Sequence, residues 1–503
     1  MPTSLSTLLA AVDLGSNSFH LQLSRVVNDQ LYPVDSLKET VRLGAGVTAE
    51  KKIDAKTAQR ALKVLRLFAE RLRGMPAEAV RVVGTNSFRV AKNAQDFITA
   101  AEAALGYPIE VIAGREEARL IYLGVAHGLP LAPLNRLVVD IGGGSTEFII
   151  GQGLKPKQVE SLYMGCVTYS ENYFPNGKLD KKALRQAELA ARRELEAIAA
   201  TYMREGWSEV IGSSGTAKVL AAILAENGLT AQGADRITAK GLAWLREQVI
   251  RAGEIKKLAL AGVREDRMPV LPGGLAIMAA VFDEFGIDSM QVVDTALRQG
   301  VLYDLLGRSQ HEDIRDATVK EFARRYHVDA AQATRVETLA LRFLAEAFDR
   351  FDPNNDEADY RRLCLLRWAC HLHEIGIGVA QGAFHKHSSY IIANADLPGF
   401  SRREQARLAA LVLGCRGKLE KLGTALADRE MTTLVFCLRL AVLLSRSRRD
   451  IDARLLHIDR THHGFRLNVA AEWLTEHSLT EYSLKGEARD WEAQGLAFDV
   501  CGQ

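Results

Sequence analysis

Cysteine pairs and long apolar stretches are scarce in this sequence, and each scarcity excludes a class of protein. The six cysteines among 503 residues form neither a CxxC pair nor a dense framework. A small disulfide-stabilised secreted fold is therefore excluded, and a reducing cytosol is favoured. No apolar run approaches the ~20 residues of a membrane span, and residues 1–10 lack the basic start of a signal peptide. We expect a cytoplasmic protein without a transmembrane segment, and a peripheral position at the inner membrane stays open.

Net charge is also nearly absent. Lys and Arg total 64 against 62 for Asp and Glu, which leaves a formal charge of +2. A chain this close to neutral has no overall attraction for nucleic acid or acidic lipid, so a polyanion has to bind at a local basic site. We predict no nucleic-acid partner. The hydrophobic share of 48% is ordinary for a globular protein, and 503 residues exceed what one compact core holds.

One pattern occurs twice in the first third of the chain. An apolar strand leads to Asp13, a Gly/Ser turn follows, and a second apolar strand returns. The same order recurs around Asp140 over residues 136–151. Helical spacing of apolar residues in segments such as 57–73 and 180–205 alternates with these strands. The repeat predicts two similar α/β lobes.

The pattern of apolar and polar residues changes after Gly307. Residues 311–448 are helical in pattern, for example at 336–351 and 363–373, and from about 451 short strands return at 465–469, 483–484 and 497–500. We therefore predict four parts in chain order: a lobe at 1–128, a lobe at 129–307, a helical domain at 308–450 and a small mixed domain at 451–503.

Three Gly/Ser/Thr turns at strand ends are the strongest chemical signal. Glycines allow backbone N–H groups to converge on an anion, and hydroxyl groups add donors. One such turn is best explained as a tight turn, but three of them, two with an Asp at the strand end, favour phosphate binding. None matches a P-loop or GxGxxG motif in full. The predicted phosphate-binding residues are Asp13, Gly15, Ser16, Asn17, Ser18, Gly142, Gly143, Gly144, Ser145, Thr146, Gly212, Ser213, Ser214, Gly215 and Thr216.

Carboxylates beside phosphate turns need a bridging cation, and Mg²⁺ prefers oxygen ligands of this kind. Asp13 and Asp140 lie in apolar strands, where an unpaired carboxylate is costly. For Asp13 the alternative that it only fixes its own turn is equally good. For Asp140 the metal hypothesis is favoured, because Glu147 follows across the hairpin.

Glu117 and Arg89 are candidates only because phosphate turns surround them in the sequence. Acidic residues are common in the first turn of a helix, which is the simplest explanation of Glu116 and Glu117. A hydrolase, however, needs a carboxylate to accept the proton of attacking water, and Glu117 is placed for it. Arg89 could bind a phosphate through its planar guanidinium, or be a solvated surface charge.

The helical part carries a histidine group and two basic groups. For His371, His373, Glu374, His385 and His387 we favour a structural or degenerate site, because Glu374 stands where an HD-type metal site has Asp. The basic groups are explained either as solvated helix faces or as a channel for a long polyanion. They comprise Arg402, Arg403, Arg416, Lys418 and Lys421, and then Arg446, Arg448 and Arg449.

Taken together, these motifs resemble the exopolyphosphatase / guanosine pentaphosphate phosphatase (Ppx/GppA) family, and most of all a bacterial exopolyphosphatase. The resemblance covers nearly the whole chain. It is carried by residues 11–20, 114–120, 139–147, 164–167, 212–216, 272–274, 373–376 and 387–392.

The resemblance implies an α/β plus all-α protein: two actin/hexokinase-like (ribonuclease-H-like) lobes with the active site in the cleft between them, then an HD-like helical domain and a small C-terminal α+β domain. It implies that Glu117 is the catalytic base, that Asp140 and Glu147 hold Mg²⁺ and the water, and that the three turns and Arg89 contact phosphate. A homodimer with a basic polyphosphate channel is further implied. A monovalent cation such as K⁺ is left open.

We expect an enzyme that releases orthophosphate processively from the end of inorganic polyphosphate. The same chemistry on guanosine pentaphosphate is the close alternative. A non-catalytic sensor of guanosine tetra- or pentaphosphate or of polyphosphate is a third, and it is disfavoured because Glu117, Asp140 and Glu147 are all present.

Overall fold

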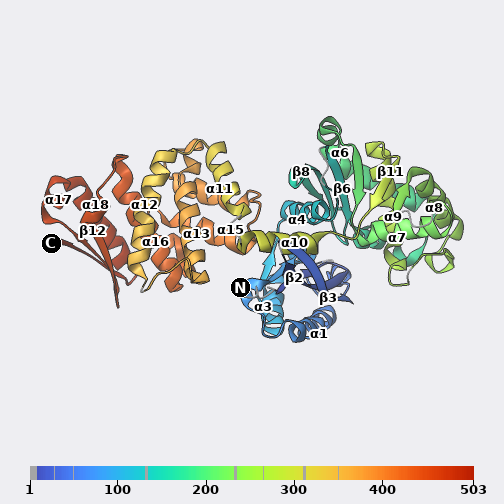
Figure 1. Ribbon diagram of the computed structural model, residues 1–503, viewed down its shortest axis with the longest axis horizontal. Helices are drawn as coiled ribbons and strands as arrows, with labels where there is room; N and C mark the ends of the chain where they lie inside the picture. The colour runs from blue at the N-terminus through green and yellow to red at the C-terminus, as the bar shows by residue number, and fades with distance from the viewer. Residues whose placement is uncertain are drawn as a thin grey trace. The chain divides into compact units, whose positions relative to one another are not determined.

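The computed structural model describes residues 8–27, 29–48, 50–130, 134–230, 235–263, 265–309, 313–348 and 350–502 (Figure 1). The chain divides into two compact units, Met1–Asp313 and Ile314–Gln503, which are treated separately below. The first unit contains two β-sheets and the second a bundle of helices with one small sheet.

The first sheet has the strand order β3-β2-β1-β4-β5. Its strands are β1 (Leu8–Leu14), β2 (Ser18–Val27), β3 (Gln30–Thr40), β4 (Val80–Gly84) and β5 (Ile109–Val111). Side chains of β1 alternate between two cores, as strand geometry requires. Ala10, Val12 and Leu14 join the core beneath helices α1 (Ala55–Leu72) and α3 (Ala94–Leu105), whereas Leu9 and Ala11 face the opposite side.

The second sheet repeats this topology. Its order is β10-β11-β9-β6-β7-β8, so β8, β7, β6, β9 and β11 correspond to β3, β2, β1, β4 and β5, and β10 is an added antiparallel edge strand. The strands are β6 (Arg136–Ile141), β7 (Thr146–Gln152), β8 (Lys155–Leu162), β9 (Glu209–Gly212), β10 (Arg236–Thr238) and β11 (Ser289–Val292). The repeat predicted from sequence is therefore a repeat of fold, and both lobes are ribonuclease-H-like.

Helices α4 (Gly114–His127) and α10 (Leu297–Ser309) lie between the two sheets (Figure 1). One core contains apolar side chains of both helices, of the first sheet and of the second. The two helices touch backbone to backbone: a Cβ added to Gly300 would lie 1.7 Å from the carbonyl oxygen of Leu120. Only glycine permits this approach, so the helix pair is a closely fixed layer between the lobes.

Helix α9 (Leu271–Phe285) is the most apolar helix of the second lobe, whose core it shares with α6 (Lys181–Glu205). Residues 268–285 pass a test of length and composition for a membrane span, but 72% of that window is buried inside the protein. Such burial is typical of the core helix of a globular domain.

The second unit is built from helices around a continuous core that also includes its small sheet. The helices are α11 (Ile314–Arg325), α12 (Ala330–Ala347), α13 (Glu357–Leu372), α14 (Phe384–Asn394), α15 (Arg402–Gly414), α16 (Arg429–Leu444), α17 (Ala471–Glu476) and α18 (Ser478–Glu492). The sheet has the order β12 (Leu456–Thr461), β13 (Gly464–Val469), β14 (Ala497–Gly502). Phe436 of α16 stacks on Phe465 of β13 with ring centroids 3.9 Å apart.

The strand predicted at 483–484 is wrong, because these residues lie within helix α18. The buried residues of α18 are Leu484, Glu487 and Trp491, which are spaced three and four apart, the period of a helix face. Predicted and observed helix ends also differ: α12 begins at Ala330, after the N-cap Asp329, and ends at Ala347.

Candidate active site

The first two strand-end turns, Gly15–Ser18 and Gly142–Thr146, have the same local geometry. A Cβ added to Gly15 would lie 3.0 Å from the carbonyl oxygen of Ser18, and a Cβ added to Gly142 would lie 3.0 Å from that of Ser145. Asp13 pairs across its hairpin with His20, and Asp140 pairs with Glu147. Directly paired residues project from the same face of a sheet. Each lobe therefore presents a cross-strand pair of ionisable side chains beside a phosphate-type turn.

The turns of the two lobes approach each other closely. A Cβ on Gly143 would meet the Cβ of Ser16 at 2.9 Å, and one on Gly144 would meet the Asn86 side chain at 2.5 Å. The Ser87 hydroxyl donates to Ser16 Oγ at 2.9 Å. These contacts join residues far apart in the sequence, and they leave no room for side chains on the second turn. Only glycine fits at Gly143 and Gly144, because a side chain would collide with these neighbours.

The third turn contacts the second. Ser213 Oγ donates to Asp140 Oδ2 at 2.7 Å, which ties the turn to the metal-ligand candidate. Ser214 caps helix α7 (Gly215–Glu226) by accepting from the backbone N–H of Ala217 at 3.0 Å. The free N–H groups of a helix N-terminus favour an anion. The structure therefore brings the three predicted turns together.

Glu117 lies in the first turn of α4 and is 8% exposed. Its Oε2 accepts a hydrogen bond from Arg89 Nη1 at 2.7 Å. Arg89 belongs to α2 (Asn86–Val90) and also donates to the carbonyl oxygen of Ile112 at 3.1 Å. Burial alone would lower the pKa of Arg89, but the Glu117 carboxylate raises it. The prediction for Arg89 was a contact to phosphate, and the structure shows it holding the base candidate.

Four carboxylates influence one another at this place: Glu117, Asp140 and Glu147, which are buried, and Asp13, which is partly buried. Burial raises the pKa of Asp13 to about 7, opposed by Arg298 and reinforced by Glu117 and Asp140. Burial likewise raises the pKa of Asp140 to about 6, against the hydrogen bond from Ser213. The pKa of Glu147 rises well above its usual range through burial and the charges of Glu117 and Asp140.

The donor set fits a hydrated magnesium ion. Among the described residues, no three His, Cys, Asp or Glu side chains enclose a metal position. Mg²⁺ is commonly held by one or two carboxylates, several waters and substrate phosphates, so a full protein cage is not needed. Serine hydroxyls bind one oxygen each of Asp140 and Glu147, with Ser161 Oγ donating to Glu147 Oε1 at 2.8 Å. A cation would offset the burial and the carboxylate repulsion that raise these pKa values.

Sequence reasoning missed several residues of the site. Asn86 and Ser87 follow strand β4 just as the other turns follow their strands, so their position after a strand could have identified them from the sequence. Arg298 of α10 donates to Nδ1 of His20 at 2.8 Å across 278 positions, and no local pattern reveals that contact. Burial and the Arg298 charge lower the pKa of His20 to about 2, so this imidazole is neutral.

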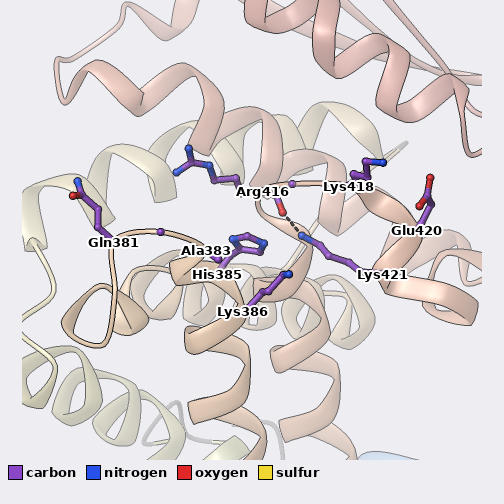
Figure 2. Close-up of a pocket in the computed structure, with 10 residues that line it drawn as sticks. Gln381, Ala383, His385, Lys386, Arg416, Lys418, Glu420 and Lys421 are labelled. Atoms are coloured by element: carbon purple, nitrogen blue, oxygen red, sulfur yellow. Dashed lines mark hydrogen bonds between the residues drawn. The ribbon is translucent and has the colours of Figure 1, made fainter.

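In the second unit, part of the predicted basic group surrounds a pocket of about 680 Å³ (Figure 2). Lys386, Arg416, Lys418 and Lys421 line it with His385. Burial, and then the charge of Arg439, lower the pKa of Lys421 to about 8. A hydrogen bond from Lys421 to the Arg416 carbonyl oxygen is drawn in Figure 2.

The other histidines and basic residues are placed differently. Arg448 donates to Glu374 at 2.9 Å and to Asp329 at 2.8 Å, so it does not line the pocket. His371 pairs with Glu337 at 2.8 Å, and His373 Nδ1 bonds to the Cys370 carbonyl oxygen at 2.7 Å. The histidine group is thus divided among separate partners.

Converging Gly/Ser turns, a buried acid at a helix start and a shared set of carboxylates define a phosphate-processing protein of the actin/hexokinase-like fold. The family model "Ppx/GppA phosphatase family" matches residues 23–309, and the model of its domain III matches residues 314–488. The chain belongs to the Ppx/GppA phosphatase family.

Relatives of both branches are similar to the chain. A guanosine-5'-triphosphate,3'-diphosphate pyrophosphatase from Aeromonas hydrophila is 37% identical over 495 residues, which cover 97% of this chain and 98% of that protein. The solved structure of an exopolyphosphatase from Cytophaga hutchinsonii has a TM-score of 0.55 and 26% identity over 60% of this chain and 98% of its own. The PPX-GPPA enzyme of Aquifex aeolicus has a TM-score of 0.50 and 26% identity over 59% of this chain and 99% of its own.

Proposed function

We propose that this phosphatase hydrolyses the terminal 5'-phosphoanhydride bond of guanosine pentaphosphate and releases orthophosphate. The observation that carries the chemistry is the convergence of the three turns and Glu117 on one buried set of carboxylates. Full-length similarity to the Aeromonas protein supports the guanosine substrate over the polyphosphate that the sequence motifs alone favoured.

In this proposal Glu117 accepts the proton of the attacking water, and Arg89 fixes the carboxylate through its hydrogen bond to Oε2. Backbone N–H groups of the Gly142–Gly144 turn and of the α7 N-terminus bind the oxygens of the terminal phosphate. Asp140 and Glu147 would hold Mg²⁺, which when bound neutralises charge on the phosphate oxygens. The bond between the terminal phosphorus and its bridging oxygen breaks as the bond to the water oxygen forms, and guanosine tetraphosphate leaves with that oxygen on its 5'-diphosphate.

Inorganic polyphosphate is the second candidate substrate, and two observations favour it. One is the similarity to the Cytophaga exopolyphosphatase. The other is the basic pocket of the second unit, because four lysine and arginine side chains around one hollow suit a polyanion. Both substrates end in a phosphoanhydride, so the same catalytic residues serve either.

The test measures orthophosphate release from guanosine pentaphosphate, long polyphosphate and ATP at equal magnesium concentration. We expect the highest kcat/KM on guanosine pentaphosphate and at least about a tenfold lower value on ATP, since recognition of the guanosine end adds binding energy. A higher kcat/KM on polyphosphate would move the chain to the exopolyphosphatase branch. Absence of release from all three would overturn the hydrolase assignment for this chain.

A further inference from the structure

A buried ionic cluster lies beside the helix that carries Glu117. At its centre is Asp304 of α10, whose side chain is 4% exposed. Asp304 Oδ1 accepts from Arg119 Nη2 at 2.5 Å, and Oδ2 accepts from Arg81 Nη1 at 2.6 Å and from Arg308 Nε at 3.1 Å. Three arginines from strand β4, helix α4 and helix α10 thus meet on one carboxylate.

Two further acids complete the Asp304 network. Arg119 donates to both oxygens of Glu116, each at 2.8 Å. Arg81 Nε donates to Glu110 Oε2 at 3.0 Å. Each of the three arginines thereby has at least one carboxylate partner. Burial would raise the pKa of Asp304, but Arg119, Arg81 and Arg308 hold it below its usual range.

The network reaches the active site through the first turn of α4. Glu116 and Glu117 are consecutive, so they project about 100° apart around the helix. Arg119 holds Glu116 on one side, and Arg89 holds Glu117 on the other. The remaining charged groups that act on Glu117 are Asp13, Asp140 and Glu147, all outside the network.

The ionic bonds add a directional link to the contact between α4 and α10. Just before α10, a Cβ added to Gly124 would lie 2.1 Å from the Ala296 carbonyl oxygen, so backbone meets backbone there. Apolar side chains of both helices share one core, and apolar contacts of this kind are not directional. The fork of Arg119 joins the two helices and has fixed geometry, which a flexible lysine lacks.

We propose that Asp304 and Arg119 are positioning residues, which fix the first turn of α4 and thereby aim the Glu117 carboxylate at the phosphate turns. The inference rests on the proposed function, in which Glu117 is the base. A misplacement of about 1 Å in a catalytic group costs up to roughly 100-fold in rate. The residues that bind phosphate lie on other elements, so substrate binding does not depend on the network.

The deciding variant is Arg119→Lys, which keeps the charge and removes the fork. We expect kcat on guanosine pentaphosphate to fall about 10- to 100-fold with KM within about twofold of wild type. Asp304→Asn should reduce kcat comparably, and Asp304→Glu should recover part of the loss because it restores the carboxylate. Combining Arg119→Lys with Asp304→Asn should cost less than the sum of the two single effects, since both remove the Arg119–Asp304 contact and only Asp304→Asn also affects Arg81 and Arg308.

The matched control is Arg362→Lys in the second unit. Arg362 also bridges two acids, Asp359 at 2.6 Å and Glu430 at 2.9 Å, and a purely structural loss there should lower the melting temperature without changing kcat. A folded Arg119→Lys protein with kcat within about twofold of wild type, or with a raised KM and normal kcat, overturns the inference. Glu117→Gln is measured in parallel: if it is inactive while Arg119→Lys is normal, only the positioning role fails, and if it stays active, the proposed function fails as well.

Discussion

At the scale of single residues, sequence motifs predicted the acids of the site, but the contacts between them form only when the chain folds. Asp13 and Asp140 were predicted because acids in apolar strands are costly without partners, and Glu147 because it follows Asp140 across the hairpin. These acids raise one another's pKa because the two lobes bring them close together, and no single segment of the sequence shows that approach. The hydrogen bond of Arg89 to Glu117 was not predicted for the same reason, because the two residues are 28 positions apart.

Glu117→Gln tests the base directly. The amide keeps the size of the side chain but cannot accept the proton of water, so we expect kcat to fall about 10²- to 10⁴-fold while substrate still binds. Phosphate release is measured together with binding of guanosine pentaphosphate by calorimetry. A variant that keeps more than about a tenth of the wild-type rate would place the base elsewhere. Glu247→Gln, at an exposed position of helix α8 (Ala239–Ala252), is the control outside the site.

Asp140→Asn and Glu147→Gln should each raise the Mg²⁺ concentration needed for half-maximal activity. Each loses an oxygen ligand with full charge, and magnesium prefers such ligands. Activity is titrated against magnesium at saturating substrate. Unchanged titration curves in both variants would remove these residues as ligands, whether direct or through water.

The raised pKa of Asp13, about 7, predicts a stability change with pH in the absence of magnesium. Between about pH 4 and 7 the folded state keeps a proton that the unfolded state has lost, so stability falls as pH rises. We expect the melting temperature to drop by a few degrees over this range, and Asp13→Asn to flatten the drop. Added Mg²⁺ should stabilise wild type more at pH 7 than at pH 5. A pH profile of Asp13→Asn that parallels wild type would contradict the assignment.

At the scale of elements, hairpins, strongly periodic helices and the short strands at 465–469 and 497–500 were predicted well, and the two-residue strand at 483–484 was not. The β1–β2 and β6–β7 hairpins follow from alternating apolar residues around a Gly/Ser turn. Residues 483–484 were assigned to a strand because a two-residue segment cannot show a period, whereas Leu484, Glu487 and Trp491 mark a helix face. The close backbone contact at α4 and α10 depends on Gly124 and Gly300, which are 176 positions apart, so no periodic pattern in the sequence predicts it.

Gly144→Ala should disable the site through sterics alone. The added Cβ would lie 2.5 Å from Asn86 Oδ1, so the turn or Asn86 has to move and kcat should fall by about tenfold or more. In the double variant Gly144→Ala with Asn86→Ala, the nearest remaining Asn86 atom is Cβ at 3.6 Å, an ordinary contact. The melting temperature should therefore recover in the double variant. Gly378→Ala is the control, because nothing lies within 4 Å of its added Cβ.

At the scale of the whole molecule, the motif set predicted the family and the two-lobed fold, but it did not settle the substrate. The turns and Glu117 would act on a terminal phosphoanhydride, which both candidate substrates carry, so these residues do not distinguish the two branches. The two branches therefore have to differ in how they recognise the rest of the substrate, which is a guanosine in one case and a long phosphate chain in the other. The basic pocket of the second unit is the described feature best suited to the long chain.

Charge removal in that pocket therefore tests the polyphosphate alternative. In the variant Lys386→Gln, Arg416→Gln, Lys418→Gln and Lys421→Gln, polyanion contacts are lost while the residues of the first unit are untouched. We expect unchanged kcat/KM on guanosine pentaphosphate, weaker binding of long polyphosphate, and a reduced dependence of that binding on salt.

Gel analysis of partially digested long polyphosphate is the measurement that decides. Several contacts that hold a chain between cleavages make its hydrolysis processive, so intermediate lengths should be visible with the variant and not with wild type. The control replaces Arg402 and Arg403 by Gln, since neither lines the pocket. If the pocket variant still degrades long chains without intermediates, the pocket does not retain the polymer, and its positive charge serves another anion.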